Sequence, residues 1–256
     1  ATPADEARRA PAREGEGRAA RIAILARGSR GDIQPLAALA VRLRQNGHCV
    51  KVICNDNYGR GESQGHADLF RSLGMEVDVF PWDDDGATGR RQCYIFDSVK
   101  AFMPDVLLYW WLLLLEAWVV EERLGIPAVE YSLGILTSRE SAQWCMDRLQ
   151  SSAKQQLDSH VGACTLSDVR CVDDLCARLW NRARPSLYAV SLHVVDVRGE
   201  WPKPTEAAGV HLTGYWLFDL RMQMQLVEAG NAFFGSKEYQ RLATFVEAGE
   251  PPVYIG

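Results

Sequence analysis

The sequence has 256 residues, 47% of them hydrophobic and 24% charged, which is typical of a soluble globular chain able to bury a sizeable core. Its formal net charge of −5 disfavours nucleic acid as the main partner, because phosphate binding favours a basic surface. The seven cysteines are odd in number and lack CxxC spacing. We therefore expect reduced thiols rather than a disulfide framework or a metal site.

The N-terminal segment and the most apolar run argue against secretion and membrane insertion. Residues 1–20 are mainly Ala, Arg, Glu and Pro without an apolar stretch, which predicts a disordered tail and no secretory signal. The run 106–120 spans about 15 residues and contains Glu116, whereas a membrane-spanning helix needs about 20. We expect a cytoplasmic chain in which this run forms two buried elements in series.

The first third of the chain alternates between strand and helix patterns. A buried strand at 21–26 leads through a turn-rich segment to a helix that starts at Ile33, with Pro35 in its first turn and Asn46-Gly47 as its stop. The following elements are a strand at 48–54, a helix at 66–73 and a strand at 76–80. This alternation predicts a Rossmann-like α/β fold, with a parallel sheet flanked by helices.

The same alternation continues towards the C-terminus. We predict strands at 105–109, 127–132, 187–197 and 210–214, and helices at 112–124, 139–156, 168–183 and 237–248. The run Asp83-Asp84-Asp85-Gly86 predicts a solvated turn. Residues 252–256 resemble a new strand that stops as it starts. We therefore predict one domain over residues 21–248 and the start of a second, truncated domain over residues 249–256.

The residues best suited to chemistry lie in the turn between the first strand and the first helix. Such turns open on the carboxyl edge of a parallel sheet, where ligands bind. Gly28 and Gly31 let the backbone turn tightly and approach a ligand, and the helix N-terminus favours an anion such as a diphosphate. The turn matches neither GxGxxG nor GxxxxGK[ST], so it lacks the residues of a dinucleotide or P-loop site.

Several motifs in order resemble one family. Gly28-Ser29-Arg30-Gly31-Asp32-Ile33-Gln34-Pro35 and Asn46-Gly47-His48 are similar to the opening of sterol glucosyltransferases and related family 28-type glycosyltransferases. Pro104-Asp105-Val106, Leu124-Gly125-Ile126-Pro127 and His211-Leu212-Thr213-Gly214-Tyr215-Trp216 agree with later segments. The terminal stretch 249–256 resembles the junction between the two domains. The stretch 82–104 is shorter than its family counterpart, and 151–182 is cysteine-rich without a counterpart.

The resemblance implies the N-terminal, acceptor-binding half of a GT-B enzyme with two Rossmann-like domains. Asp32 would be the general base of an inverting displacement, with Ser29 orienting the acceptor hydroxyl or a phosphate oxygen. Gly28, Arg30 and Gly31 would form the loop beside the donor diphosphate. The resemblance implies a UDP-sugar as co-substrate, held mainly by the missing C-terminal domain in cis or in trans, and neither cofactor nor metal. The acceptor would be a sterol, another lipid or a small hydroxylated molecule, and a lipid acceptor would bring contact with a membrane surface.

Each of these residues also has a structural interpretation. Asp32 stands where a helix N-cap is expected, so capping and catalysis both remain open. Trp110, Trp111 and Trp216 could line an apolar acceptor pocket or simply pack in the core.

Two other functions compete with transfer of glucose or another hexose. One is a non-catalytic acceptor-binding module or degenerate paralogue without a donor domain, and the other is a generic nucleotide-binding doubly wound domain. We expect no sugar transfer by this chain alone.

Overall fold

A computed structural model of the chain describes residues 18–55, 65–80, 89–133, 139–180, 185–191, 193, 210–234 and 236–250. The predicted loop at 83–86 and the predicted strand at 252–256 lie outside these residues, as does the predicted tail apart from residues 18–20. The division into domains stays a prediction.

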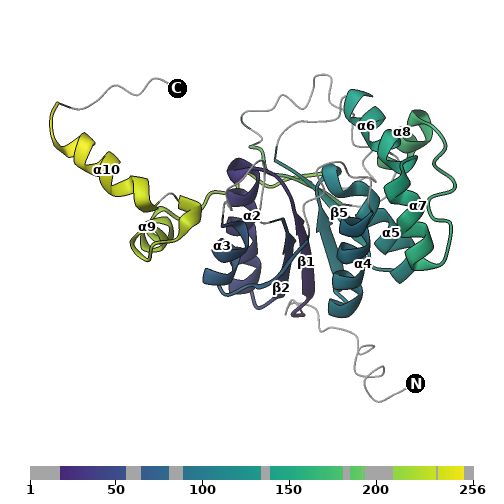
Figure 1. The fold of residues 1–256 in the computed structure, drawn as a ribbon, viewed down its shortest axis with the longest axis horizontal. Helices are drawn as coiled ribbons and strands as arrows, with labels where there is room; N and C mark the ends of the chain where they lie inside the picture. The colour runs from purple at the N-terminus through teal and green to yellow at the C-terminus, as the bar shows by residue number, and fades with distance from the viewer. Residues whose placement is uncertain are drawn as a thin grey trace, which may run out of the picture.

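A seven-stranded sheet forms the centre of the molecule, and all of its strand pairs are parallel (Figure 1). Its order is β3-β2-β1-β4-β5-β6-β7, which confirms the predicted Rossmann-like α/β fold. The strands are β1 (Arg21–Ala26), β2 (Cys49–Cys54), β3 (Glu76–Val79), β4 (Val106–Tyr109), β5 (Ala128–Ser132), β6 (Ser186–Tyr188) and β7 (Val210–Leu212). Because the strand order reverses between β1 and β4, the carboxyl edge of these two strands is the expected ligand crevice.

Helices cover both faces of the sheet, as Figure 1 shows. The α-helices are α2 (Arg30–Gln45), α3 (His66–Ser72), α4 (Arg90–Phe102), α5 (Leu114–Leu124), α6 (Arg139–Leu149), α7 (Ser152–Val161), α8 (Val172–Trp180), α9 (Leu220–Glu228) and α10 (Ser236–Glu247). Two short 3-10 helices are η1 (Trp111–Leu113) and η2 (Ala232–Phe234). Helices α2 and α3 lie on one face, and α4 and α5 lie on the other with α6 to α8 beyond them.

The alternation of side chains along β1 divides the core into two clusters. Ala23 and Leu25 pack with α4 and α5, whereas Ile22, Ile24 and Ala26 pack with α2 and α3. Successive side chains of a strand point to opposite faces, so a continuous apolar run is what a strand buried on both faces requires. The central strands are therefore fixed by the burial of both of their faces.

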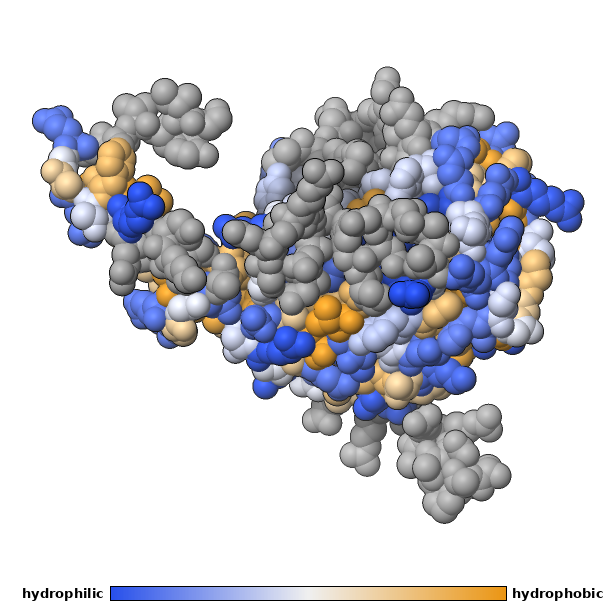
Figure 2. All heavy atoms as spheres, viewed as in Figure 1, coloured by the Kyte–Doolittle hydropathy of each residue, from blue (hydrophilic) through white to orange (hydrophobic). Residues whose placement is uncertain are grey.

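Helices α9 and α10 extend away from the sheet body as an arm (Figure 1). Figure 2 shows hydrophobic residues on this arm, and three large apolar side chains of α10 are exposed, namely Leu242, Phe245 and Val246. Asp219 caps α9, its carboxylate accepting hydrogen bonds from the backbone N–H groups of Arg221 and Met222.

Several predicted boundaries were wrong for local reasons. The first helix begins at Arg30 rather than Ile33, because Ser29 is its N-cap, so Pro35 lies in the second turn instead of the first. The helix predicted over 139–156 is two helices, and Ser151 starts the second. The strand predicted over 187–197 is observed only as β6, and residues 192 and 194–200 lie outside the described residues.

The sequence patterns missed α4 and α9. Helix α4 buries Arg91 and Gln92 near its start, so the residues on its inward face do not form the apolar pattern that predicts a helix. The seven cysteines are all free of disulfide bonds, as predicted.

Candidate functional site

The turn from β1 into α2 brings Gly28 against the side chain of Asp32. Gly28 has φ of +139°, a backbone conformation that side-chain-bearing residues rarely adopt. A Cβ at this position would stand 2.3 Å from Oδ2 of Asp32 and 2.6 Å from its Cβ. Glycine is therefore needed at position 28 for two reasons. Other residues rarely adopt this backbone angle, and the Asp32 side chain occupies the space that a Cβ would take.

Asp32 is held through one of its two carboxylate oxygens. Its Oδ2 accepts hydrogen bonds from the backbone N–H of Ser29 at 2.7 Å and from the Ser29 hydroxyl at 2.9 Å. Within the described part of the chain, Oδ1 accepts no hydrogen bond. The side chain is only partly buried. One oxygen is thus anchored at the start of α2, while the other can accept a proton from a bound molecule.

Two of the expectations for this turn need correction. Asp32 is the third residue of α2 rather than its N-cap, and it closes a capping box with Ser29. Gly31 lies inside the helix and is not among the glycines with positive φ. A Cβ on Gly31 would meet only Ser29 Oγ, at 3.8 Å. The tight turn therefore depends on Gly28 and not on Gly31.

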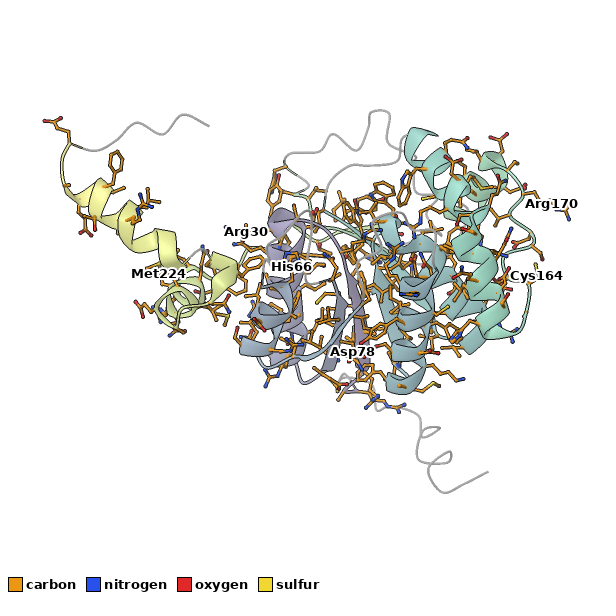
Figure 3. The ribbon with its side chains drawn as sticks, in the orientation of Figure 1. Arg30, His66, Asp78, Cys164, Arg170 and Met224 are labelled. Carbon is orange, nitrogen blue, oxygen red and sulfur yellow. The ribbon has the colours of Figure 1, made fainter. Side chains whose placement is uncertain are left out.

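Arg30 is exposed in the first turn of α2 and lies near His66, as Figure 3 shows. Its guanidinium carbon is 5.5 Å from the centre of the Phe233 ring, and the ring of buried His66 is 5.8 Å from the same phenylalanine. The contact with Phe233 joins the arm to the start of α2. A role of Arg30 beside a diphosphate stays a prediction.

Tyr131 on β5 is a site residue that the sequence patterns did not single out. Burial raises the pKa of its hydroxyl well above the usual value, and the negative charge of Asp32 raises it further. The hydroxyl therefore stays protonated and donates a hydrogen bond to the Leu25 carbonyl at 2.9 Å. The Tyr131 ring lies 6.1 Å from that of Trp216. Its position near the end of a buried strand was the only available signal.

The three predicted acceptor tryptophans do not form one group. Trp110 and Trp216 pack against the core cluster on the α2 face, while Trp111 packs against the cluster on the α4 and α5 face. The rings of Trp110 and Trp111 meet edge to face at 5.7 Å, and Trp111 meets Trp144 of α6 at 5.2 Å. Within the described residues, the buried indole N–H groups of Trp110 and Trp111 have no hydrogen-bond partner.

A buried charged cluster lies on the α4 and α5 flank of the same edge. Glu116 in the first turn of α5 is within 3.4 Å of Nε of Arg91 and within 3.1 Å of the Arg148 guanidinium. Burial alone would raise the pKa of Glu116, but the positive charges of Arg148, Arg91 and Arg27 lower it below its usual range. The cluster therefore contains three guanidinium groups around this one carboxylate.

The described ranges hold neither a metal-binding cluster nor a membrane-spanning helix. No group of three His, Cys, Asp or Glu side chains there is placed to hold a metal ion. No helix in those ranges is long and apolar enough to span a membrane.

Comparison with known proteins locates the similarity in the segment that holds Asp32. Residues 22–76 match the family described as glycosyltransferase family 28 N-terminal domain. A curated relative, O-mycaminosyltylonolide 6-deoxyallosyltransferase of Streptomyces fradiae, is 26% identical over 282 aligned residues, which cover 92% of this chain. The chain spans only 60% of the length of that relative.

A solved structure, the glycotransferase of kitacinnamycin, shares the fold. It superposes with a TM-score of 0.51 and 18% sequence identity over 79% of this chain and 53% of the other. In its segment 22–76 the chain therefore matches a family 28 glycosyltransferase N-terminal domain, within an α/β fold that it shares with a GT-B-like glycosyltransferase.

Proposed function

We propose that this chain is the acceptor-binding half of an inverting glycosyltransferase that moves a hexose from a UDP-sugar to a hydroxyl group. The observation that carries the proposal is the carboxylate of Asp32, anchored through Oδ2 and available through Oδ1 at the carboxyl edge of β1. The family 28 match spans this residue, which supports the proposal independently of the geometry.

Direct displacement assigns a defined task to each group in this turn. Asp32 takes the proton of the acceptor hydroxyl while the hydroxyl oxygen attacks the anomeric carbon. The bond from that carbon to the phosphate oxygen breaks, and the nucleoside diphosphate leaves. The N-terminus of α2 and the exposed Arg30 place positive charge where the leaving diphosphate would accumulate negative charge.

The aromatic surroundings of Asp32 support an acceptor with an apolar body. Tyr131 is close enough for the charge of Asp32 to act on its hydroxyl, its ring contacts that of Trp216, and Trp110 packs against the same core cluster. The resemblance of the Gly28–Asp32 turn to that of sterol glucosyltransferases favours a sterol acceptor and UDP-glucose, whereas the relative from Streptomyces fradiae is named for transfer to O-mycaminosyltylonolide. A sterol acceptor would bring the protein to a membrane surface.

The proposal is tested first by binding and then by transfer. Calorimetric titration of this chain with a sterol in micelles and with O-mycaminosyltylonolide should show binding of one of them, and UDP-glucose should bind more weakly. The chain alone should transfer no sugar. When it is followed by a donor-binding domain, transfer from radiolabelled UDP-glucose should appear, and Asp32→Asn should lower its rate by about 100-fold or more.

Two results would count against the proposal. Equal transfer rates for the Asp32→Asn variant and the parent would remove the assigned base. Binding of UDP-glucose without binding of any hydroxylated acceptor would favour a generic nucleotide-binding domain instead.

A further inference from the structure

A cavity lies where α9 meets the sheet body, at the far end of α2 from the Asp32 turn (Figure 1). Its volume is about 530 Å³, which lies within the range of roughly 300–1,000 Å³ that small-molecule pockets have. The last turns of α2, the end of α3 with the turn that follows it, and α9 all line it. A helix rises about 1.5 Å per residue, so Arg44 in this cavity is about 18 Å from Asp32 along α2. The cavity is therefore a separate site.

The walls of the cavity are aliphatic and contain two methionines. Val41, Leu73 and Met75 come from the sheet body, and Met222 and Leu226 come from α9. Met75 and Leu226 are buried, and the other three are partly buried. None of the described lining residues is aromatic. Because methionine side chains are flexible and fill irregular spaces, these walls suit a flexible alkyl chain better than a flat ring.

Arg44 alone carries a charge among the lining residues that the structure describes. Its Nη1 donates a hydrogen bond to the Leu73 carbonyl at 2.6 Å, which places the guanidinium at the end of α3. A Cβ at Gly74 would stand 2.1 Å from the same nitrogen, so glycine leaves the space that the guanidinium fills. Within the described part of the chain Arg44 forms no ion pair. A guanidinium has five N–H donors, so most of them remain for a bound anion.

The other polar side chains of the cavity, Ser72, Gln45 and Gln225, are neutral. The Ser72 hydroxyl donates to the Leu69 carbonyl at 2.8 Å and accepts from the Asn231 amide at 3.1 Å. A polar head group in this cavity would therefore meet one positive charge and no negative charge from the described lining residues.

We propose that this cavity binds a single-chain fatty acid, with its carboxylate paired to Arg44 and its alkyl chain between Met75 and Met222. The planar fork of arginine pairs with both oxygens of a carboxylate. One guanidinium balances the single charge of a carboxylate, whereas a phosphate monoester carries up to two charges. The bound chain would contact α2, α3 and α9 together and so hold the arm against the sheet body.

The proposed carboxylate position makes binding depend on Arg44. The cavity lies at the C-terminal ends of α2 and α3, and helix C-termini disfavour anions. A charge-assisted hydrogen bond to a guanidinium is stronger than this dipole effect. Without the guanidinium the dipole effect would be left unopposed, so loss of the Arg44 charge should affect an acid much more than an alcohol.

Calorimetric titration with decanoate, octanoate and decan-1-ol tests the proposal without any sugar transfer. Decanoate should bind about tenfold more tightly than decan-1-ol because of its pair with Arg44. It should also bind about tenfold more tightly than octanoate, because it buries two more CH₂ groups. Arg44→Gln should abolish the first preference and keep the second. Arg42→Gln is the matched control and should behave like the parent, since Arg42 lies in the same last turn of α2 but does not line the cavity.

A second variant tests the apolar wall. Met222→Gln keeps the length of the side chain but replaces its apolar end, so it should weaken the binding of decanoate and of decan-1-ol by a similar factor. Thermal melting of each variant checks that it is folded.

The methionine methyl groups report where the alkyl chain binds. The chain has five methionines, of which Met75 and Met222 line the cavity. Met103 is exposed, and Met146 is buried in the core cluster on the α4 and α5 face. In spectra of protein labelled with ¹³C at the methionine methyl groups, decanoate should shift the signals of Met75 and Met222 and leave those of Met103 and Met146 unchanged.

Three results would overturn the inference. Equal binding of decanoate and decan-1-ol would leave Arg44 only as a cap of α3. Binding of decanoate without shifts at Met75 and Met222 would place the acid elsewhere on the molecule, and the absence of binding would remove the site. Decyl phosphate that binds tenfold more tightly than decanoate would assign the cavity to a phosphate head group instead. All of these results would leave the proposed function unaffected, because none of them involves the Asp32 turn.

Discussion

The two flanks of the sheet's carboxyl edge are built in opposite ways. On the α2 flank, Gly28, Ser29 and Asp32 lie within five residues and position one another through a local capping box. On the α4 and α5 flank, Glu116 meets arginines that come from α4 and α6. The first arrangement exists once one turn has formed, whereas the second exists only when the whole layer has packed. Variants on the two flanks should therefore behave differently in stability measurements.

Glu116→Gln should have the largest effect on stability. Glutamine keeps the shape but removes the charge that compensates the buried guanidinium groups of Arg91 and Arg148. Removing one partner of a buried ion pair leaves an uncompensated charge, so we expect the free energy of unfolding to fall by roughly 3 kcal/mol. Urea unfolding followed by circular dichroism measures this. A loss below about 0.5 kcal/mol would show that the cluster is not a structural element of this flank.

The parent protein and the Glu116→Gln variant also allow a test of how stability depends on pH. Because the folded state lowers the pKa of Glu116, its ionised form stabilises the fold at pH values above the usual value of 4.5. This contribution is lost as the pH falls below 4.5 through the lowered pKa. The difference in unfolding free energy between parent and Glu116→Gln should stay constant from pH 7 down to about 5 and shrink below it. If the difference in unfolding free energy grew as the pH fell, it would contradict the lowered pKa of Glu116.

On the α2 flank, Gly28→Ala and Gly31→Ala should act in opposite directions. Alanine at position 28 needs an unfavourable backbone angle and meets the Asp32 carboxylate, so we expect a loss of about 2 kcal/mol. Alanine at position 31 lies in a helix with free space, so we expect a gain of about 0.5 kcal/mol. Urea unfolding of the two variants checks both. Equal effects would mean that the turn does not depend on Gly28.

The contrast between the flanks also explains how much of the structure could be predicted from the sequence. The sheet was predictable because strands such as β1 and β2 are continuous apolar runs bounded by turns. The segment 28–32 was recognisable because its residues are neighbours in the chain. The exact start of α2 was not, because we expected Asp32 as the N-cap, and only the structure shows that Ser29 is the cap.

The α4 and α5 flank could not be predicted from the sequence in the same way. The buried face of α4 includes Arg91 and Gln92, which resemble a solvated segment until Glu116 is placed beside them. The grouping of Trp110, Trp111 and Trp216 was also out of reach, because consecutive tryptophans at a strand end pack against opposite faces of the sheet. Tyr131 depends on Asp32 and Leu25, which are about one hundred residues away in the chain.

Two substitutions of Asp32 with small effects on stability separate its structural role from its catalytic role. Asp32→Asn removes the negative charge from the first turn of α2 but leaves an oxygen that can accept from Ser29, so the loss should stay below about 1 kcal/mol. Asp32→Ala removes the acceptor as well and should cost about 1 kcal/mol. If Asp32 acts only as a cap, transfer by a protein with a donor-binding domain should follow this order and survive in Asp32→Asn. If it acts as the base, both variants should lose transfer alike despite their different stabilities, because an amide oxygen cannot take the acceptor's proton.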